Sequence, residues 1–162
     1  FAGRVKQGFS SLLAAQRGRR PYKRLERTLR ELGEEQERMS SRKFYIVLEE
    51  EFRRYLSDRT GADFKAITSS EFSDYFFEVL PEGSEGDAES IHALLRRSDQ
   101  VKFGGQNSDK RRREADMELI SRTAGEVERI KEERRKEEHR SKRRKKKKKP
   151  SRHTVEMTRR AE

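Results

Sequence analysis

The sequence contains no cysteine and no long apolar run. The absence of cysteine excludes disulfides and cysteine-ligated zinc, and it is compatible with a reducing compartment. No apolar stretch approaches the ~18 residues that a membrane-spanning helix requires, so we expect these residues not to cross a bilayer. Hydrophobic residues make up only 30% of the chain, well below the share in an ordinary globular domain. The chain can therefore bury only a local core.

The aromatic residues indicate where that core lies. Between positions 44 and 103 the sequence contains Phe44, Tyr45, Phe52, Tyr55, Phe64, Phe72, Tyr75, Phe76, Phe77 and Phe103. Residues 36–130 are therefore predicted to form one helical core domain. Residues 1–35 are interpreted as a basic juxtamembrane arm with a short amphipathic helix. Residues 131–162 are interpreted as a charged helix extension with a disordered Lys/Arg-rich tail.

The net charge of +11 is divided unevenly along the chain. Counting Lys and Arg against Asp and Glu gives +8 for residues 1–30, −7 for residues 31–139, +9 for residues 140–149 and +1 for residues 150–162. A protein that reads nucleic acid through its folded domain usually concentrates positive charge on that domain. Here the predicted core is acidic, so the core itself is not expected to read nucleic acid.

Hydrophobic spacing predicts helices in the first half of the core. Apolar residues at three- and four-residue steps indicate an amphipathic helix that begins at Pro21 and ends at Gly33. Ser40 or Ser41 is expected to cap a second helix, which ends at Gly61. Both helices are amphipathic, so each is expected to bury one face.

The second half of the core is expected to contain two more short helices and one long helix. Thr68–Glu71 has the form of a capping box and predicts the start of a third helix. Asp87 is positioned to cap a fourth helix. Asp99–Phe103 is expected to be a short extended stretch. Ser108 then opens a long helix, whose apolar stripe stops after Lys131.

The predicted fold is mainly α, a small bundle of four to five helices with at most one short strand pair. A long charged C-terminal helix and a disordered basic tail follow it. Disorder is expected for residues 140–149, because a low-complexity run of like charges repels itself. Phe52, Phe72, Phe76 and Leu95 are expected to be buried together, because they are central apolar positions of three neighbouring helices.

No catalytic constellation can be recognised in the sequence. The three histidines, His92, His139 and His153, lie in different segments, so a histidine-based triad or metal site is not expected. The Glu49-Glu50-Glu51 run is interpreted as a solvated helix face, because nothing nearby would desolvate a carboxylate. Gly104-Gly105 lacks the Lys and Ser/Thr that complete a phosphate-binding loop. The chain is therefore predicted to be no enzyme and to need no cofactor or metal.

A basic run near the C-terminus has three interpretations. It consists of Lys142, Arg143, Arg144, Lys145, Lys146, Lys147, Lys148 and Lys149. It is a solubilising tail, an anchor on anionic lipid, or a nucleic-acid or nuclear-import patch. At roughly 1 kcal/mol for each cation near an anionic membrane, eight suffice to hold the tail there, and they suit RNA phosphates equally well. No aromatic residues interleave the run for base stacking, so sequence-specific RNA binding is not favoured.

Three stretches occur in an order that resembles a known family. They are Leu48–Gly61, Ile67–Phe72 and Leu94–Phe103. Their order resembles the C-terminal cytoplasmic domain of the BatD (oxygen-tolerance) family and related tails of membrane proteins encoded beside MoxR-type AAA+ ATPases. In that family a helix ends at Gly, a Thr-led cap starts the next helix, and an Asp-x-Val-Lys-Phe-like strand precedes a last helix. The resemblance covers roughly residues 40–130 and does not extend to the lysine tail.

The resemblance implies a function as well as a location. It implies a membrane protein with an extracytoplasmic region and a span just before Phe1, so that this chain lies on the cytoplasmic side of the bacterial inner membrane. It further implies binding to MoxR-like AAA+ ATPases and von Willebrand A-domain proteins, for which Glu49 and Arg53 are the candidate contacts. The alternative is a soluble cytoplasmic RNA- or ribosome-associated protein that binds phosphate through its basic arms.

Overall fold

The structure, a computed structural model, describes residues 20–79 and 88–148. Within these ranges the chain contains five α-helices, one short 3-10 helix and no strand. The predicted small helical bundle is therefore confirmed. The predicted cap at Asp87, the basic arm before residue 20, and Lys149 with the rest of the tail lie outside the described residues.

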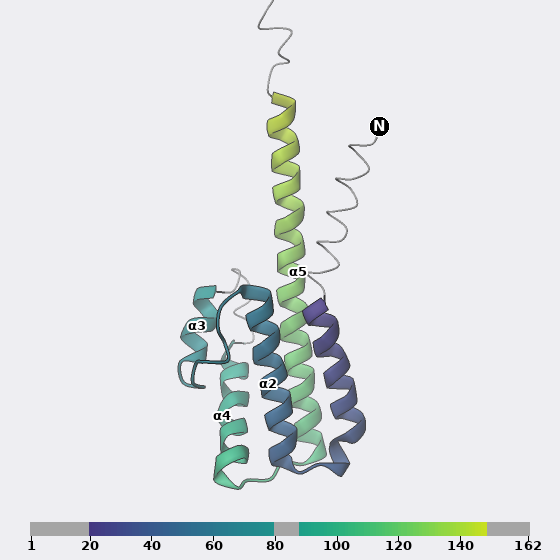
Figure 1. Ribbon diagram of the computed structural model, residues 1–162, viewed down its shortest axis with the longest axis vertical. Coiled ribbons are helices and arrows are strands. Elements are labelled where there is room, and N and C mark those ends of the chain that lie inside the picture. The colour runs from purple at the N-terminus through teal and green to yellow at the C-terminus, as the bar shows by residue number, and fades with distance from the viewer. Residues whose placement is uncertain (1–19, 80–87, 149–162) are drawn as a thin grey trace, which may run out of the picture. The chain divides into compact units, whose positions relative to one another are not determined.

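Figure 1 shows the order of the helices along the chain. The first covers residues 20–35 and leads into the 3-10 helix η1, Gln36–Arg38. The other four are α2 (Ser41–Thr60), α3 (Phe72–Val79), α4 (Ala88–Gly104) and α5 (Lys110–Lys148). The chain divides into two compact units, Phe1–Glu128 and Arg129–Glu162, and α5 contributes residues to both.

Helix α2 is the central element of the first unit (Figure 1). It packs against α4, which in turn packs against α3. Arg24 on the first helix donates to Glu51 on α2 over 2.7 Å, and the Tyr55 hydroxyl on α2 donates to the backbone carbonyl of Ala124 on α5 over 3.1 Å. Polar bonds as well as apolar packing therefore fix the neighbours of α2.

The first helix does not end at Gly33 as predicted, because it continues to residue 35 and then tightens into η1. A glycine C-cap requires a positive φ. Among the described residues only Gly61 and Gly105 have one. A Cβ at position 33 would lie 3.9 Å from the Met117 methyl group, so Gly33 faces α5 from inside the helix.

Both ends of α2 are capped as predicted. The Ser40 hydroxyl accepts a hydrogen bond from the Lys43 N–H over 3.1 Å. At the other end, Gly61 has a φ of 75° and its N–H donates to the Ser57 carbonyl over 2.9 Å. These caps satisfy orphan backbone groups and set the position at which the loop to α3 begins.

The loop between α2 and α3 ends in the predicted capping box. The Glu71 N–H donates to the Thr68 hydroxyl over 3.3 Å, and the Glu71 carboxylate accepts from the Thr68 N–H over 2.9 Å. These hydrogen bonds, the one from the Thr68 backbone first, lower the pKa of the Glu71 carboxyl. Helix α3 begins at the next residue, Phe72, so the capping box correctly predicted this start.

The predicted extended stretch at Asp99–Phe103 is wrong, because these residues form the last turns of α4. Val101 is only 6% exposed and continues the buried stripe of Ile91 and Leu94 at helical spacing. Gly105 then follows the helix with a φ of 69°, which glycine adopts without strain. A helix therefore replaces the strand that the family resemblance implied here.

Helix α5 begins one residue later than predicted and extends further. Its cap is Asp109, whose carboxylate accepts from the Arg112 N–H over 2.8 Å. The predicted apolar stripe is confirmed in the first unit, where Ile120, Ala124 and Val127 are completely buried. The expectation of disorder from residue 140 onward is wrong for residues 140–148, which are helical.

The predicted core cluster is confirmed. Phe52, Phe72, Phe76 and Leu95 are each at most 1% exposed, and they belong to one apolar cluster. The Phe72 and Phe76 rings stack with their centroids 5.5 Å apart. Two of the ten aromatic residues expected in this region lie outside the core: Phe77 is 49% exposed and Phe103 is 78% exposed.

Candidate functional site

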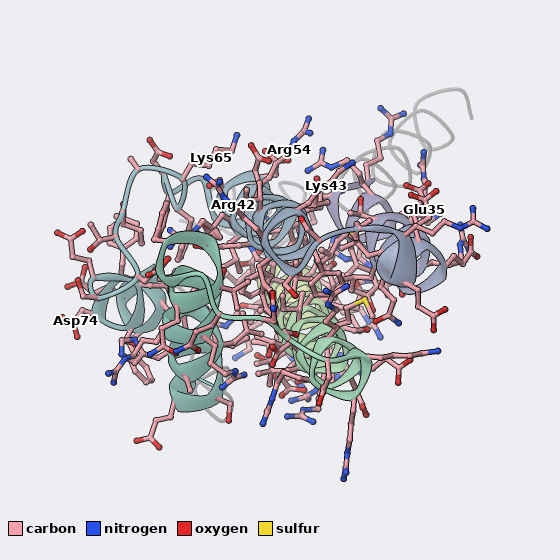
Figure 2. All side chains as sticks on the ribbon, turned by 90° about the horizontal axis from the view of Figure 1, so that it is seen from below. Glu35, Arg42, Lys43, Arg54, Lys65 and Asp74 are labelled. Carbon is pink, nitrogen blue, oxygen red and sulfur yellow. The ribbon has the colours of Figure 1, made fainter. Side chains whose placement is uncertain are left out.

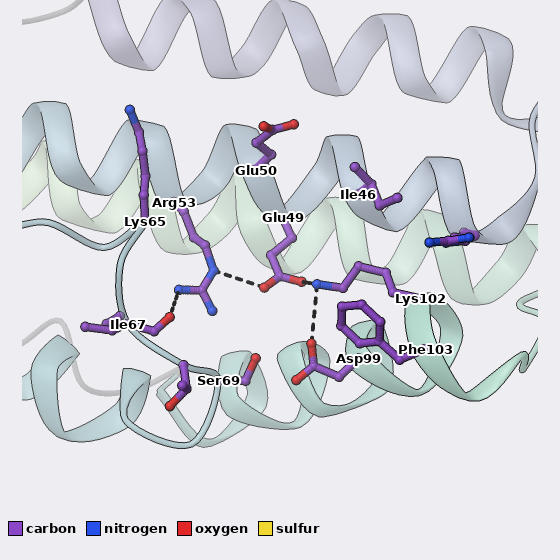
Figure 3. A pocket seen from close by; sticks show the side chains of 12 residues that line it. Ile46, Glu49, Glu50, Arg53, Lys65, Ile67, Ser69, Asp99, Lys102 and Phe103 are labelled. Atoms are coloured by element: carbon purple, nitrogen blue, oxygen red, sulfur yellow. Dashed lines mark hydrogen bonds and ion pairs between the residues drawn. The ribbon is translucent and has the colours of Figure 1, made fainter.

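A groove of about 660 Å³ runs along the first unit between α2, the loop that follows it, and α4 (Figure 3). It is lined by Arg42, Ile46, Glu49, Glu50, Arg53, Lys65, Ile67, Thr68, Ser69, Asp99, Lys102 and Phe103. The lining therefore combines a charged network with apolar side chains.

Glu49 is the centre of the charged network. Its carboxylate accepts from the Arg53 Nε over 3.0 Å, from the Lys102 Nζ over 2.7 Å, and from the Ser98 hydroxyl. Glu49 is only 6% exposed, so these contacts form in a partly dehydrated environment where they are strong. Lys102 also approaches the Asp99 carboxylate at 3.3 Å, which adds a second anion to the network (Figure 3).

Arg53 on α2 forms hydrogen bonds with the loop that follows this helix. One of its terminal nitrogens donates to the carbonyls of Phe64 and Ile67, over 2.7 and 2.8 Å. Its guanidinium also lies over the Phe72 ring, 5.5 Å from the centroid. Because Arg53 is 8% exposed and all these partners are fixed, one wall of the groove is rigidly positioned.

Glu49 and Arg53 therefore differ from their predicted role. They were expected to be exposed contacts for a partner, but both are buried and bonded to each other. The interpretation of Glu49-Glu50-Glu51 as one solvated face is likewise wrong for Glu49. The i,i+4 spacing of Glu49 and Arg53 was the available signal, since such pairs attract on a helix.

The exposed part of the groove was not predicted as a site. Ile46 on α2 is 40% exposed and Phe103 at the end of α4 is 78% exposed. The Lys102 ammonium lies 5.2 Å from the Phe103 ring centroid, which favours one ring position through a cation–π contact. Sequence reasoning missed this pair because Phe103 was assigned to a strand and counted as a core residue.

Two exposed cations border the apolar part. Arg42 and Lys65 both line the groove and reach outward from the first unit (Figure 2). Among the described residues neither forms an ion pair. The exposed anion in the same lining is Glu50. The groove therefore offers open positive charge beside exposed apolar side chains.

A second, smaller cavity of about 380 Å³ adjoins the groove and shares part of its lining. Its walls are Thr68, Ser69, Ser70, His92, Arg96 and Asp99. The Thr68 and Ser70 hydroxyls bond each other over 3.0 Å, and Thr68 also serves the capping box. This cavity therefore lies beside the capped start of α3.

Buried polar groups elsewhere in the first unit join helices. Asp116, which is 1% exposed, accepts from the Tyr45 hydroxyl and from Arg97, each over 2.6 Å. Burial, followed by the hydrogen bond to Asp116, raises the pKa of Tyr45 to about 12. Burial also raises the pKa of Tyr55, with the Glu128 carboxylate as the next cause. These contacts are structural.

The described residues of the predicted basic run, Lys142, Arg143, Arg144 and Lys145–Lys148, are exposed and belong to α5. No group of three or more His, Asp or Glu side chains in residues 20–79 and 88–148 is arranged to hold a metal ion. In the same ranges no helix combines the length and the apolar character needed to cross a membrane.

Comparisons with protein-family models, curated proteins and solved structures found no match to this chain. Its class therefore rests on fold and site together. The first unit is a small helical bundle with a groove whose floor is a buried charge network and whose rim is apolar and cationic.

Proposed function

We propose that the first unit is a non-enzymatic protein-interaction domain and that it binds its partner in the groove between α2 and α4. The exposed pair of Ile46 and Phe103 carries this proposal. Large apolar side chains that share an exposed concave surface are typical of interaction sites. Aromatic side chains in particular serve as anchors at protein interfaces.

The polar groups on the groove floor favour binding over chemistry. The Glu49 carboxylate is engaged by Arg53, Lys102 and Ser98 together. A general base needs free access to a substrate proton, and a nucleophile needs an adjacent base that is not otherwise occupied. The network satisfies its own members, so it supports a rigid docking surface.

Charge complementarity identifies the kind of partner. The groove lining contains four cations, Arg42, Arg53, Lys65 and Lys102, and three anions, Glu49, Glu50 and Asp99. This excess of positive charge lies within residues 31–139, which carry a net charge of −7. Complementary potentials favour the correct partner and repel others. We therefore assign the groove to a partner segment that has an apolar anchor and flanking Asp or Glu residues.

The resemblance to BatD-like tails supplies candidate partners, namely MoxR-type AAA+ ATPases and von Willebrand A-domain proteins. It also supports a place on the cytoplasmic side of a bacterial inner membrane, after a membrane span. The reading frame upstream of Phe1 tests that location. An apolar span of about 20 codons there supports it, whereas a start codon directly before Phe1 favours the soluble alternative.

Calorimetry with the two purified candidate partners tests the function. A Phe103→Ser variant is expected to weaken binding about tenfold or more, because it removes the aromatic anchor. Phe77→Ser is the matched control, since Phe77 is also an exposed phenylalanine but does not line the groove. Equal weakening by the two variants would contradict binding in the groove.

A photoreactive benzoylphenylalanine at position 103 tests the groove without assuming the partner. Crosslinks to an acidic segment with an apolar residue are expected at position 103 and not at position 77. If neither candidate binds but such a segment is crosslinked, the groove remains the site and the BatD-based choice of partner is wrong. Crosslinks of equal yield at both positions overturn the groove itself.

A further inference from the structure

The second unit contains a stretch of α5 that neutralises itself. Residues 129–138 carry five cations and four anions. Glu133 accepts from Arg129 over 2.8 Å and Glu132 accepts from Arg135 over 2.8 Å, both within the helix. Ion pairs at i,i+3 and i,i+4 stabilise the helical state of such a charged stretch. This stretch, about 15 Å long, therefore acts as a helical spacer.

The next stretch has the opposite character. Residues 140–148 contain eight cations, no anion and one neutral residue, Ser141, and all nine are exposed. Successive side chains on an α-helix are turned by about 100°. Seven consecutive cations, Lys142–Lys148, therefore point in every direction around the axis, and no apolar face remains.

This distribution of charge discriminates between the two anionic ligands. A lipid surface contacts one side of a helix, and a helix that lies in the interface buries an apolar face there. Residues 140–148 have no such face. The major groove of duplex DNA is about 12 Å wide and admits an α-helix of 10–12 Å diameter, with phosphates along both flanks. Cations all around the axis can contact phosphates on both flanks in the groove, whereas a lipid surface meets only those on one side.

The charge densities also agree. Nine helical residues span about 13 Å. Duplex DNA carries one charge for each ~1.7 Å of its axis, which gives about eight phosphates over that length. The helix brings eight cations to the same length.

We propose that residues 140–148 bind duplex DNA as a helix seated in the major groove, through its phosphates and without reading the sequence. Base reading uses paired contacts from side chains such as Asn and Gln, or from Arg held in register on a base edge. The segment has no Asn or Gln, and its repeated lysines fix no register. Binding also relieves the repulsion between like charges three and four residues apart, so the helix is stabilised by its ligand.

The experiment measures binding of the full chain to a 24-base-pair DNA duplex, to one of its single strands and to vesicles containing phosphatidylserine. All three are compared at equal phosphate concentration over a range of salt. Residues 1–30 carry a charge of +8 and can also bind anionic ligands. The decisive quantity is therefore the difference in the binding constant between each variant and the unchanged chain. Replacing Lys145–Lys148 with Gln is expected to reduce the slope of log K against log salt by about 3 to 4 on the duplex.

A matched pair of variants isolates the helical geometry. Lys145→Pro and Lys145→Ala remove the same charge, but only the proline breaks the helix. The proposal expects the proline variant to bind the duplex several-fold more weakly than the alanine variant, with no such difference on vesicles. Equal duplex binding by these two variants overturns it, as does a preference for vesicles over the duplex.

Discussion

The two units use the same charged residue types in opposite ways. In the first unit Glu49, Arg53 and Asp116 are buried and each has several partners. In the second unit the Arg129–Glu133 pair is exposed on both sides, with 54% and 58% of the side chains accessible. Breaking a buried pair is costly because a charge is left without compensation, whereas exposed pairs contribute little. Buried charges therefore hold the helices of the first unit in position. In the second unit the charges are exposed, and the excess of cations in residues 140–148 makes that part of α5 strongly positive.

The contrast between buried and exposed side chains is largest for adjacent phenylalanines on α3. Phe76→Ala is expected to lower the free energy of unfolding by about 3 to 5 kcal/mol, because it opens a cavity beside the stacked Phe72 ring. This loss is comparable to the whole stability of a small domain. Phe77→Ala is the control and is expected to cost much less, since Phe77 is half exposed. Urea unfolding followed by circular dichroism measures both, and similar midpoints for the two variants would contradict the assigned core.

Glu49 and Glu50, which are adjacent on α2, give the same comparison of a buried with an exposed side chain for charged residues. Glu49→Gln is expected to cost about 3 kcal/mol, because Arg53 and Lys102 lose their shared carboxylate in a partly dehydrated site. Glu50→Gln, one residue further along, is the control and is expected to change stability by less than about 0.5 kcal/mol. Thermal and urea unfolding measure the difference. If the two variants unfold alike, the network is not the support of the groove.

Much of the fold follows from local sequence signals. Ser40, Gly61 and the Thr68–Glu71 box correctly predicted helix ends, because caps depend on a few neighbouring residues. The end at Gly33 was wrong because a glycine inside a helix and a C-cap glycine look the same in sequence. The strand predicted at Asp99–Phe103 was wrong because two apolar residues within five positions fit both the two-residue period of a strand and the 3.6-residue period of a helix.

The groove was less predictable than the fold. Burial of Glu49 depends on Ser98 and Lys102, which lie about 50 residues away and are brought close only when α4 packs on α2. Phe103 is exposed because of its position around the axis of α4. The predicted strand placed these residues in a different geometry, so this exposure could not be predicted. Long-range pairing of this kind leaves no periodic signal, so a charge run could be recognised from sequence while its environment could not.

The buried hydroxyl of Tyr45 predicts a loss of stability in alkali. Its pKa is raised to about 12 in the folded chain, while the unfolded value is near 10. An acid whose folded pKa is raised stabilises the fold fully below pH 10, and this contribution is lost as the pH rises through 12. The expected total loss is about 3 kcal/mol, at roughly 1.4 kcal/mol for each pKa unit.

Tyr45→Phe isolates this contribution. Below pH 10 the variant is expected to be about 1 kcal/mol less stable, through loss of the bond to Asp116. Between pH 10 and 12 its stability should fall less steeply than that of the wild type. All other groups are the same in both proteins, so the difference in urea midpoints reports Tyr45 alone. Equal slopes for the two proteins would contradict its burial against Asp116.

The smallest effect is expected in the second unit, where Glu133→Gln removes one partner of the exposed Arg129 pair. Exposed pairs at i,i+4 contribute about 0.3 to 0.5 kcal/mol, because water screens the charges and both side chains lose freedom. The change in helix signal at 222 nm on heating should therefore be small at 10 mM salt and smaller still at 150 mM, where the Debye length is about 8 Å. Glu49→Gln is the contrasting variant, since its buried charge network should respond little to the same salt. A loss above about 1 kcal/mol for Glu133→Gln would show that the second unit depends on individual ion pairs, and that the two units use charge in the same way.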